Sequence, residues 1–141
     1  MNEIKKCILD ACDENMEAVN NFIHSLIPPD ACEKLIKCLD LAVEEIFINI
    51  AHYAYYPKRG TVEIFCDYCQ EEGLLSITFK DKGSPFNPIE KADPDICKSA
   101  EDREPGGLGI FLTKKFMDNV SYVYYEGQNI LTLQKKIKNT D

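Results

Sequence analysis

The sequence predicts an α+β fold, a two-layer α/β sandwich in which helices cover one face of a mixed, mostly antiparallel sheet. Three observations indicate this class: a long apolar helix in the first half of the chain, pairs of alternating strands joined by short turns, and an ordinary globular composition. Apolar residues make up 45% of the chain and charged residues 28%. We expect residues 1–141 to form one domain, because 141 residues suffice for a single core.

The first predicted elements are a weak strand over residues 3–9 and a helix that Asp13 begins as an N-cap. Apolar residues at helical spacing follow Asp13 until the Pro-Pro pair at 28–29 ends that helix. Asp30 is then expected to cap a longer helix, which continues to about Tyr55. Apolar residues surround most of this helix, so it should be buried on most sides.

Two strands are predicted next, Thr61–Tyr68 and Leu74–Asp81, joined by a Glu-Glu-Gly turn. Asp81 falls on the same side of the pleat as Phe79 and the apolar residues before it. A carboxylate that continues an apolar face should lie at the mouth of the core, directed at a polar partner.

The last predicted elements are a charged segment long enough to form a lid, a helix opened by glycines, and two strands joined by a four-residue hairpin. In order they are Ile89–Pro105, Ile110–Asp118, Val120–Tyr125 and Ile130–Ile137, with the hairpin at Glu126–Asn129.

Charge and cysteine content exclude several functions. The net charge of −8 argues against direct binding of nucleic acid, which needs a basic face. No apolar run reaches the ~20 residues of a membrane span. The seven cysteines are irregularly spaced and follow no signal peptide, which predicts reduced thiols and a cytoplasmic location. Cys66 and Cys69 have the C-x-x-C spacing, but alternation there indicates a strand, not a metal or redox site.

The long helix carries Glu45, Asn49 and His52 at spacings that place them on one face. In a functional interpretation Asn49 is an oxygen ligand for Mg²⁺, and Glu45 accepts a proton from an attacking hydroxyl or water. The alternative is a solvated polar stripe or a hydrogen-bond cluster that is satisfied within the protein.

Two further stretches have both a functional and a structural interpretation. Asp81 and Gly83 suit recognition of a flat heterocycle, since the carboxylate accepts from an amine and the glycine lets a ring approach the backbone; alternatively they form a turn. The N–H groups of Gly106-Gly107-Leu108-Gly109 at a helix N-terminus suit phosphate binding, or this stretch is only a glycine-rich turn.

Taken in order, these stretches resemble the motifs of the GHKL ATP-binding superfamily, and within it the bacterial anti-sigma factor serine/threonine kinases. Glu45–Tyr55 resembles the N-box of this superfamily. Asp81–Pro88 resembles its first glycine box, and Gly106–Ile110 resembles its second. The Pro85-Phe86 pair is typical of the anti-sigma type. The resemblance covers almost the whole chain and implies a Bergerat ATP-binding fold.

The resemblance also implies a role for each matching residue. Asn49 would coordinate the Mg²⁺ of Mg-ATP, and Glu45 would act as general base. Asp81 would accept a hydrogen bond from the adenine amino group. Gly83 would pack against the base, and Gly107 and Gly109 would bind phosphates. The implied ATP-binding set is Asn49, Tyr53, Asp81, Gly83, Pro85, Phe86, Gly106, Gly107, Leu108, Gly109 and Ile110.

Two positions depart from the family pattern. The arginine that assists phosphoryl transfer corresponds to Arg103, which Glu104 and Pro105 separate from the second glycine box. The histidine near the end of the N-box stands one place early, at His52, and Tyr53 occupies its usual position. We expect the second change to tune nucleotide contacts.

The implied function is that of a cytoplasmic kinase that phosphorylates a serine or threonine on a STAS-domain anti-anti-sigma partner. Such kinases also sequester a sigma factor and commonly form homodimers. One alternative is a non-catalytic ATP-binding partner-switch regulator that only sequesters its target. Others are a histidine-kinase catalytic module without its companion domain and a purely structural protein.

Overall fold

A computed structural model describes residues 4–90 and 107–138 of the chain. Within these residues, strands β1 (Lys5–Asp10), β2 (Thr61–Cys69), β3 (Leu74–Asp81), β4 (Asn119–Tyr125) and β5 (Gln128–Lys136) form one sheet. The strand order is β1-β2-β3-β5-β4, and all four pairings are antiparallel. The described sheet is therefore antiparallel throughout, whereas the sequence had predicted a mixed, mostly antiparallel one.

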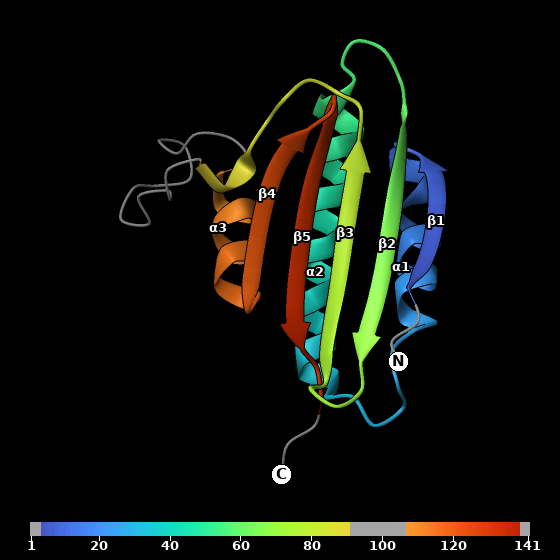
Figure 1. The fold of residues 1–141 in the computed structure, drawn as a ribbon, viewed down its shortest axis with the longest axis vertical. Coiled ribbons are helices and arrows are strands. Elements are labelled where there is room, and N and C mark those ends of the chain that lie inside the picture. Colours follow the sequence, from blue (N-terminus) through green and yellow to red (C-terminus); the bar gives the residue numbers. More distant parts are fainter. Residues whose placement is uncertain (1–3, 91–106, 139–141) are drawn as a thin grey trace.

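In the described part of the chain, three α-helices lie on one face of the sheet: α1 (Met16–His24), α2 (Glu33–Asn49) and α3 (Gly107–Phe116) (Figure 1). A π-helical turn, η2 (Ile50–Ala54), continues α2, while η1 (Asp13–Asn15) and η3 (Pro88–Glu90) are short 3₁₀ turns. The predicted α+β class, with helices on one face of the sheet, is confirmed.

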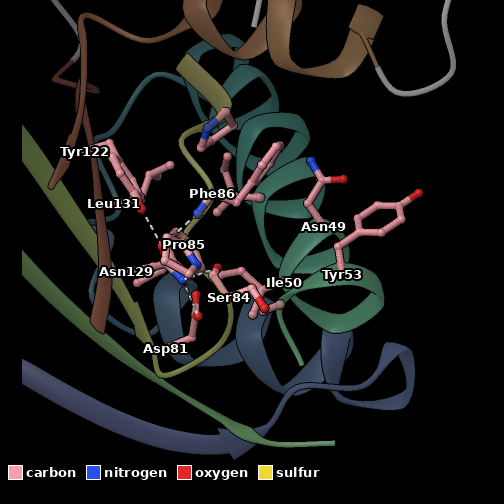
Figure 2. Close-up of a pocket in the computed structure, with 14 residues that line it drawn as sticks. Asn49, Ile50, Tyr53, Asp81, Ser84, Pro85, Phe86, Tyr122, Asn129 and Leu131 are labelled. Carbon is pink, nitrogen blue, oxygen red and sulfur yellow. Dashed lines mark hydrogen bonds between the residues drawn. The ribbon is translucent and has the colours of Figure 1, made fainter. Parts of the chain in front are cut away.

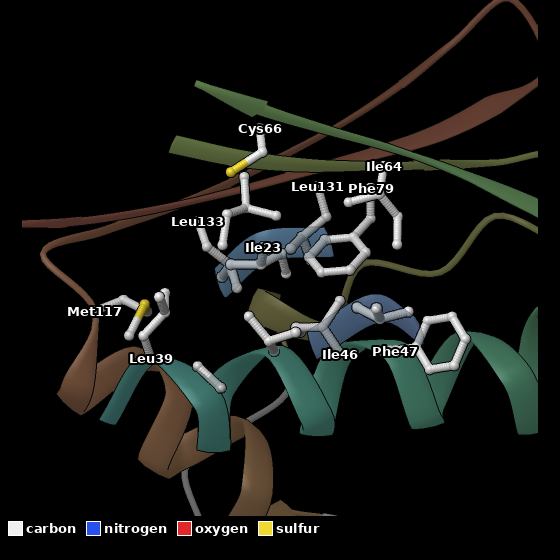
Figure 3. Close-up of a cluster of buried hydrophobic side chains, with 14 of the residues drawn as sticks. Ile23, Leu39, Ile46, Phe47, Ile64, Cys66, Phe79, Met117, Leu131 and Leu133 are labelled. Carbon is white, nitrogen blue, oxygen red and sulfur yellow. The ribbon is translucent and has the colours of Figure 1, made fainter. Parts of the chain in front are cut away.

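The core lies between the inner face of the sheet and helices α1 and α2 (Figure 3). Strand β3 illustrates how the sheet contributes one face to this core. Every second side chain along it is buried and the next is only partly buried, as the pleat requires. Each large apolar side chain removed from water here contributes roughly 1.5–3 kcal/mol. The largest fully buried side chains are Phe47, Phe79, Ile23, Leu39, Ile64, Leu75, Ile77, Leu133 and Ile137.

The N-caps differ from those predicted, because long-range pairing sets where the long helix begins. Ala31 bridges to Lys138, and the Cys32 N–H donates to the Ile137 carbonyl at 2.8 Å. This holds Cys32 in an extended conformation as the N-cap of α2, so Asp30 does not cap it. Asp13 lies inside η1, one turn before α1, and caps neither helix.

The hairpin between β4 and β5 is tighter than predicted. Its turn consists of Glu126 and Gly127, with φ of 50° and 79°, the left-handed geometry that two-residue hairpins favour. The predicted four-residue hairpin is wrong, because Gln128 and Asn129 already belong to β5. As a result Asn129 lies directly opposite Asp81 of β3.

The cysteines of the described part of the chain are all unpaired, as predicted: Cys7, Cys12, Cys32, Cys38, Cys66 and Cys69. Cys66 is buried in the core, and Cys69, three residues along β2, points to the other face of the sheet. The two thiols therefore cannot act as a C-x-x-C pair. None of the described helices has the length and apolarity needed to cross a bilayer.

Candidate functional site

A cavity of about 270 Å³ lies between the C-terminal end of α2 and the sheet (Figure 2). Apolar side chains form most of its wall, and a few polar groups stand among them, which is typical of small-molecule sites. Its lining residues are Ile46, Asn49, Ile50, Tyr53, Ala54, Phe79, Asp81, Ser84, Pro85, Phe86, Pro88, Tyr122, Asn129 and Leu131.

Asp81 is the buried acidic group of this cavity, with only 5% of its surface exposed. Its Oδ1 accepts two hydrogen bonds, from the Gly83 N–H and from Asn129 Nδ2, both at 2.9 Å. Its Oδ2 accepts none from the residues that the structure describes. Burial raises the pKa of Asp81, and the two hydrogen bonds oppose that rise. The predicted placement of this carboxylate at the end of an apolar face is confirmed.

The loop after β3 is held against the end of η2. The Ser84 N–H donates to the Ala54 carbonyl at 2.8 Å. Gly83 packs so closely that a Cβ there would lie 2.1 Å from the same carbonyl oxygen, so this position requires glycine. Pro85 and Phe86 follow at the cavity wall, exposed to solvent.

Asn49 lines the cavity from α2, and its side chain is oriented by Glu45. Asn49 Nδ2 donates to Glu45 Oε1 at 3.0 Å, as the four-residue helical spacing allows. Within the described residues Asn49 Oδ1 accepts no hydrogen bond, so this oxygen is available to a ligand.

His52 does not join this face, contrary to prediction. The helix changes to a π turn after Asn49, and His52 pairs with Asp13 at 2.8 Å.

Glu45 also contacts the start of α3. It lines a second hollow of about 220 Å³ between α2 and α3, together with Gly109. A Cβ on Gly109 would lie 2.1 Å from Glu45 Cδ, so the carboxylate rests directly against this glycine. The beginning of the glycine-opened helix is thereby brought next to the Asn49–Glu45 pair.

The structure gathers most of the predicted site residues that it describes. Asn49, Tyr53, Asp81, Pro85 and Phe86 line the cavity, while Glu45 and Gly109 meet beside it. Gly83 is not part of the cavity wall, and Ile110 is buried in the core. Gly107 and Leu108 form the first residues of α3. The remaining predictions, Arg103, Gly106 and residues 91–105 of the predicted lid, lie outside the described residues.

The sequence analysis missed Asn129, which is 94% buried beside Asp81. It accepts from the Phe86 N–H at 3.1 Å and from the Tyr122 hydroxyl. It donates to Asp81 and to the Ser84 carbonyl, each at 2.9 Å. An asparagine at the start of an apolar strand was the available signal, but the predicted hairpin placed this residue in a turn.

Comparisons of the sequence and the fold with known proteins identify a matching family, related proteins and a solved structure. The family model described as Histidine kinase-like ATPase domain matches residues 11–135. The chain is 32% identical over 95 residues to Serine/threonine-protein kinase BtrW of Bordetella bronchiseptica, covering 67% of this chain and 66% of that protein. It is 31% identical over 100 residues to Serine-protein kinase RsbW of Listeria monocytogenes, covering 68% and 63%.

A third relative is Anti-sigma F factor of Clostridium acetobutylicum, 32% identical over 96 residues, covering 68% of this chain and 66% of that protein. The matches thus span 63–66% of the length of these curated relatives.

A solved structure of the RsbU and RsbW domains of a Mycobacterium tuberculosis protein matches with a TM-score of 0.67. That match covers 98% of this chain and 33% of the other at 13% identity, so it shows the fold alone. The predicted resemblance is confirmed: the chain, whose family match spans residues 11–135, belongs to the histidine kinase-like ATPase domain family.

Proposed function

We propose that this chain binds Mg-ATP in the cavity and transfers the γ-phosphoryl group to a serine or threonine of a STAS-domain anti-anti-sigma partner. One observation carries the proposal: Asn49 and Asp81 line the same cavity, and Glu45 joins Asn49 to the first turn of α3. The relatives named as serine or threonine kinases and as an anti-sigma factor support this class of activity.

The cavity suits the base of the nucleotide. Its volume of about 270 Å³ is close to the ~300 Å³ at which small-molecule pockets begin, and Ile46, Ile50 and Phe79 offer apolar contacts for a base. Asp81 Oδ2 is an acceptor without a partner among the described residues, so it would accept from the exocyclic amine of adenine. Tyr53 and Phe86 are exposed aromatic rings at the cavity wall and would contact the nucleotide.

The polar side of α2 suits the metal. Among the described residues Asn49 Oδ1 has no hydrogen-bond donor, and amide oxygen is a ligand that Mg²⁺ accepts alongside phosphate oxygens. When bound, Mg²⁺ would neutralise phosphate charge, which matters in a chain of net charge −8. We assign the backbone N–H groups of Gly106, Gly107 and Gly109 to the phosphates, with Leu108 and Ile110 in the same segment, and Arg103 to the transferred group.

Glu45 is the proposed general base. It would accept the proton of the partner's hydroxyl while that oxygen bonds to the γ-phosphorus. The bond from phosphorus to the bridging oxygen breaks in the same step, and ADP leaves. Glu45 lies beside both Asn49 and α3, which supports this role, because the proposal places the metal and the phosphates at these two elements.

The test is to mix the protein with a STAS-domain protein encoded beside it or recovered by pull-down, together with γ-labelled ATP and Mg²⁺. Label on a partner serine or threonine supports the kinase. Bound ATP without transfer favours a non-catalytic regulator that only sequesters its target. Label on His24 or His52 of the chain itself would favour a histidine-kinase module.

We further propose that the chain sequesters a sigma factor, forms a homodimer, acts in the cytoplasm and folds as one domain over residues 1–141. The relative named as an anti-sigma factor supports the first of these. Light scattering of the protein alone, and then of the protein with a candidate sigma factor, measures both assemblies. A monomeric mass at micromolar concentration would contradict the dimer.

A further inference from the structure

Asn129 is the centre of a buried hydrogen-bond network on the sheet side of the cavity (Figure 2). It lies in β5 directly opposite Asp81 of β3. Its neighbours in this network come from three separate segments: Asp81 at the end of β3, Ser84 and Phe86 in the following loop, and Tyr122 in β4.

The amide of Asn129 uses its whole hydrogen-bonding capacity inside the protein. Nδ2 donates to Asp81 Oδ1 and to the Ser84 carbonyl, each at 2.9 Å, and lies 3.4 Å from the Gly83 carbonyl. Oδ1 accepts from the Phe86 N–H and the Tyr122 hydroxyl. A flipped amide would set its oxygen against three acceptors, so only one orientation is stable. Asn129 therefore acts on a ligand through Asp81.

This network decides what Asp81 presents to the cavity. Oδ1 already accepts from Asn129 and Gly83, which leaves Oδ2 as the acceptor for a ligand. Both donors favour the charged carboxylate, opposing the burial that raises the pKa of Asp81. A charged carboxylate accepts from an amine and repels a carbonyl oxygen. Position 6 of a purine differs in this way, since adenine has an amine there and hypoxanthine a carbonyl.

On the basis of the proposed nucleotide-binding function, we propose that Asn129 is a positioning residue that sets the preference of this site for 6-aminopurine over 6-oxopurine nucleotides. It holds Asp81 as a charged acceptor facing the cavity. Asn129 also hydrogen-bonds to Ser84 and Phe86. One side chain therefore positions both Asp81, which would contact the base, and the loop at the cavity wall.

The test compares the dissociation constants of ATP and ITP by calorimetry with Mg²⁺. In ITP a carbonyl replaces the amine at position 6 of the purine, and the neighbouring N1 becomes an N–H donor. We expect the wild type to prefer ATP by at least about tenfold, the value of one well-formed hydrogen bond. Asn129→Ala should reduce that preference about tenfold by weakening ATP much more than ITP. Asn129→Leu fills the vacated volume and should reduce the preference for ATP to the same extent. It provides the test if the alanine variant does not fold.

Asn119→Ala is the matched control. Asn119 lies in the same strand pair, and its Nδ2 donates to Gln134 Oε1 at 3.1 Å, away from the cavity. This variant should keep the wild-type ratio of ATP to ITP affinity.

Three results separate the possibilities. Equal losses of ATP and ITP affinity in folded Asn129 variants would reduce Asn129 to a structural role and overturn the inference. A wild type that binds ATP and ITP equally would overturn it too, while leaving ATP binding intact. A wild type that binds neither nucleotide overturns the proposed function itself, and the inference with it.

Discussion

Asn49 donates its side-chain N–H to Glu45, with 3.0 Å between Asn49 Nδ2 and Glu45 Oε1. The bond fixes which end of the Asn49 amide faces the carboxylate and leaves its oxygen for another partner. One carboxylate thus orients the proposed metal ligand and also serves as the proposed base. The two roles can be separated because glutamine at position 45 retains an oxygen that accepts the same hydrogen bond.

Glu45→Gln should leave Mg-ATP affinity within about twofold of the wild type and slow phosphoryl transfer by at least ~10²-fold. Asn49→Ala removes the proposed ligand oxygen and should weaken Mg-ATP binding about tenfold or more. Calorimetry with Mg-ATP and single-turnover transfer to the partner measure the two quantities. Equal loss of binding in both variants would contradict the assignment of Glu45 as base.

Gly109→Ala should displace the Glu45 carboxylate, because its Cβ would lie 2.1 to 2.3 Å from the atoms of that group. The carboxylate is the end of a flexible, partly exposed side chain and can turn aside, so we expect the free energy of unfolding to fall by no more than about 1 kcal/mol. Urea denaturation followed by circular dichroism measures it. In the Glu45→Ala background the space is free, so the same glycine substitution should cost much less. An additive double mutant would show that the two groups do not touch.

Asp81→Asn should abolish base recognition and yet raise the melting temperature at pH 7. Burial raises the pKa of Asp81 above its ordinary 3.8, so the folded protein holds this proton more tightly than the unfolded chain. The stability from that proton is present at low pH and is lost as pH rises through 3.8 and the folded pKa.

Asparagine removes this cost and keeps an oxygen for the donors from Gly83 and Asn129. The gain in melting temperature should therefore shrink as pH falls through the folded pKa of Asp81 and vanish below its ordinary 3.8, as scanning calorimetry across pH will show. A variant less stable than the wild type at pH 7 would show that the charge contributes more through its hydrogen bonds than it costs through burial.

Cys66 should resist alkylation in the native protein at pH 8. Burial raises the pKa of its thiol from 9.0 to about 12, and the thiolate is the reactive form. Partly exposed Cys32 and Cys38 should be labelled by iodoacetamide under the same conditions, and all cysteines in denaturant. Peptide mapping by mass spectrometry identifies each site. Labelling of Cys66 as fast as Cys38 in the folded state would contradict its burial in the core.

Several features of the molecule follow from local sequence. Alternation along Leu74–Asp81 correctly predicted a strand with a buried carboxylate at its end. The spacing of Glu45 and Asn49 correctly placed them on one helical face. Both succeed because side-chain direction within a helix or strand repeats with a fixed period, so neighbours in the chain determine it.

Other features required contacts between distant parts of the chain. Asn129 meets Asp81 across 48 residues only because a two-residue turn sets the register of β5. Because Ala31 bridges to Lys138, α2 begins later than the sequence predicted. Because the helix becomes a π turn after Asn49, His52 pairs with Asp13 and does not lie beside Asn49. The sequence determined by itself the elements and the residue types of the site. Tertiary structure decided which of them meet, because register and packing depend on contacts that local periodicity does not encode.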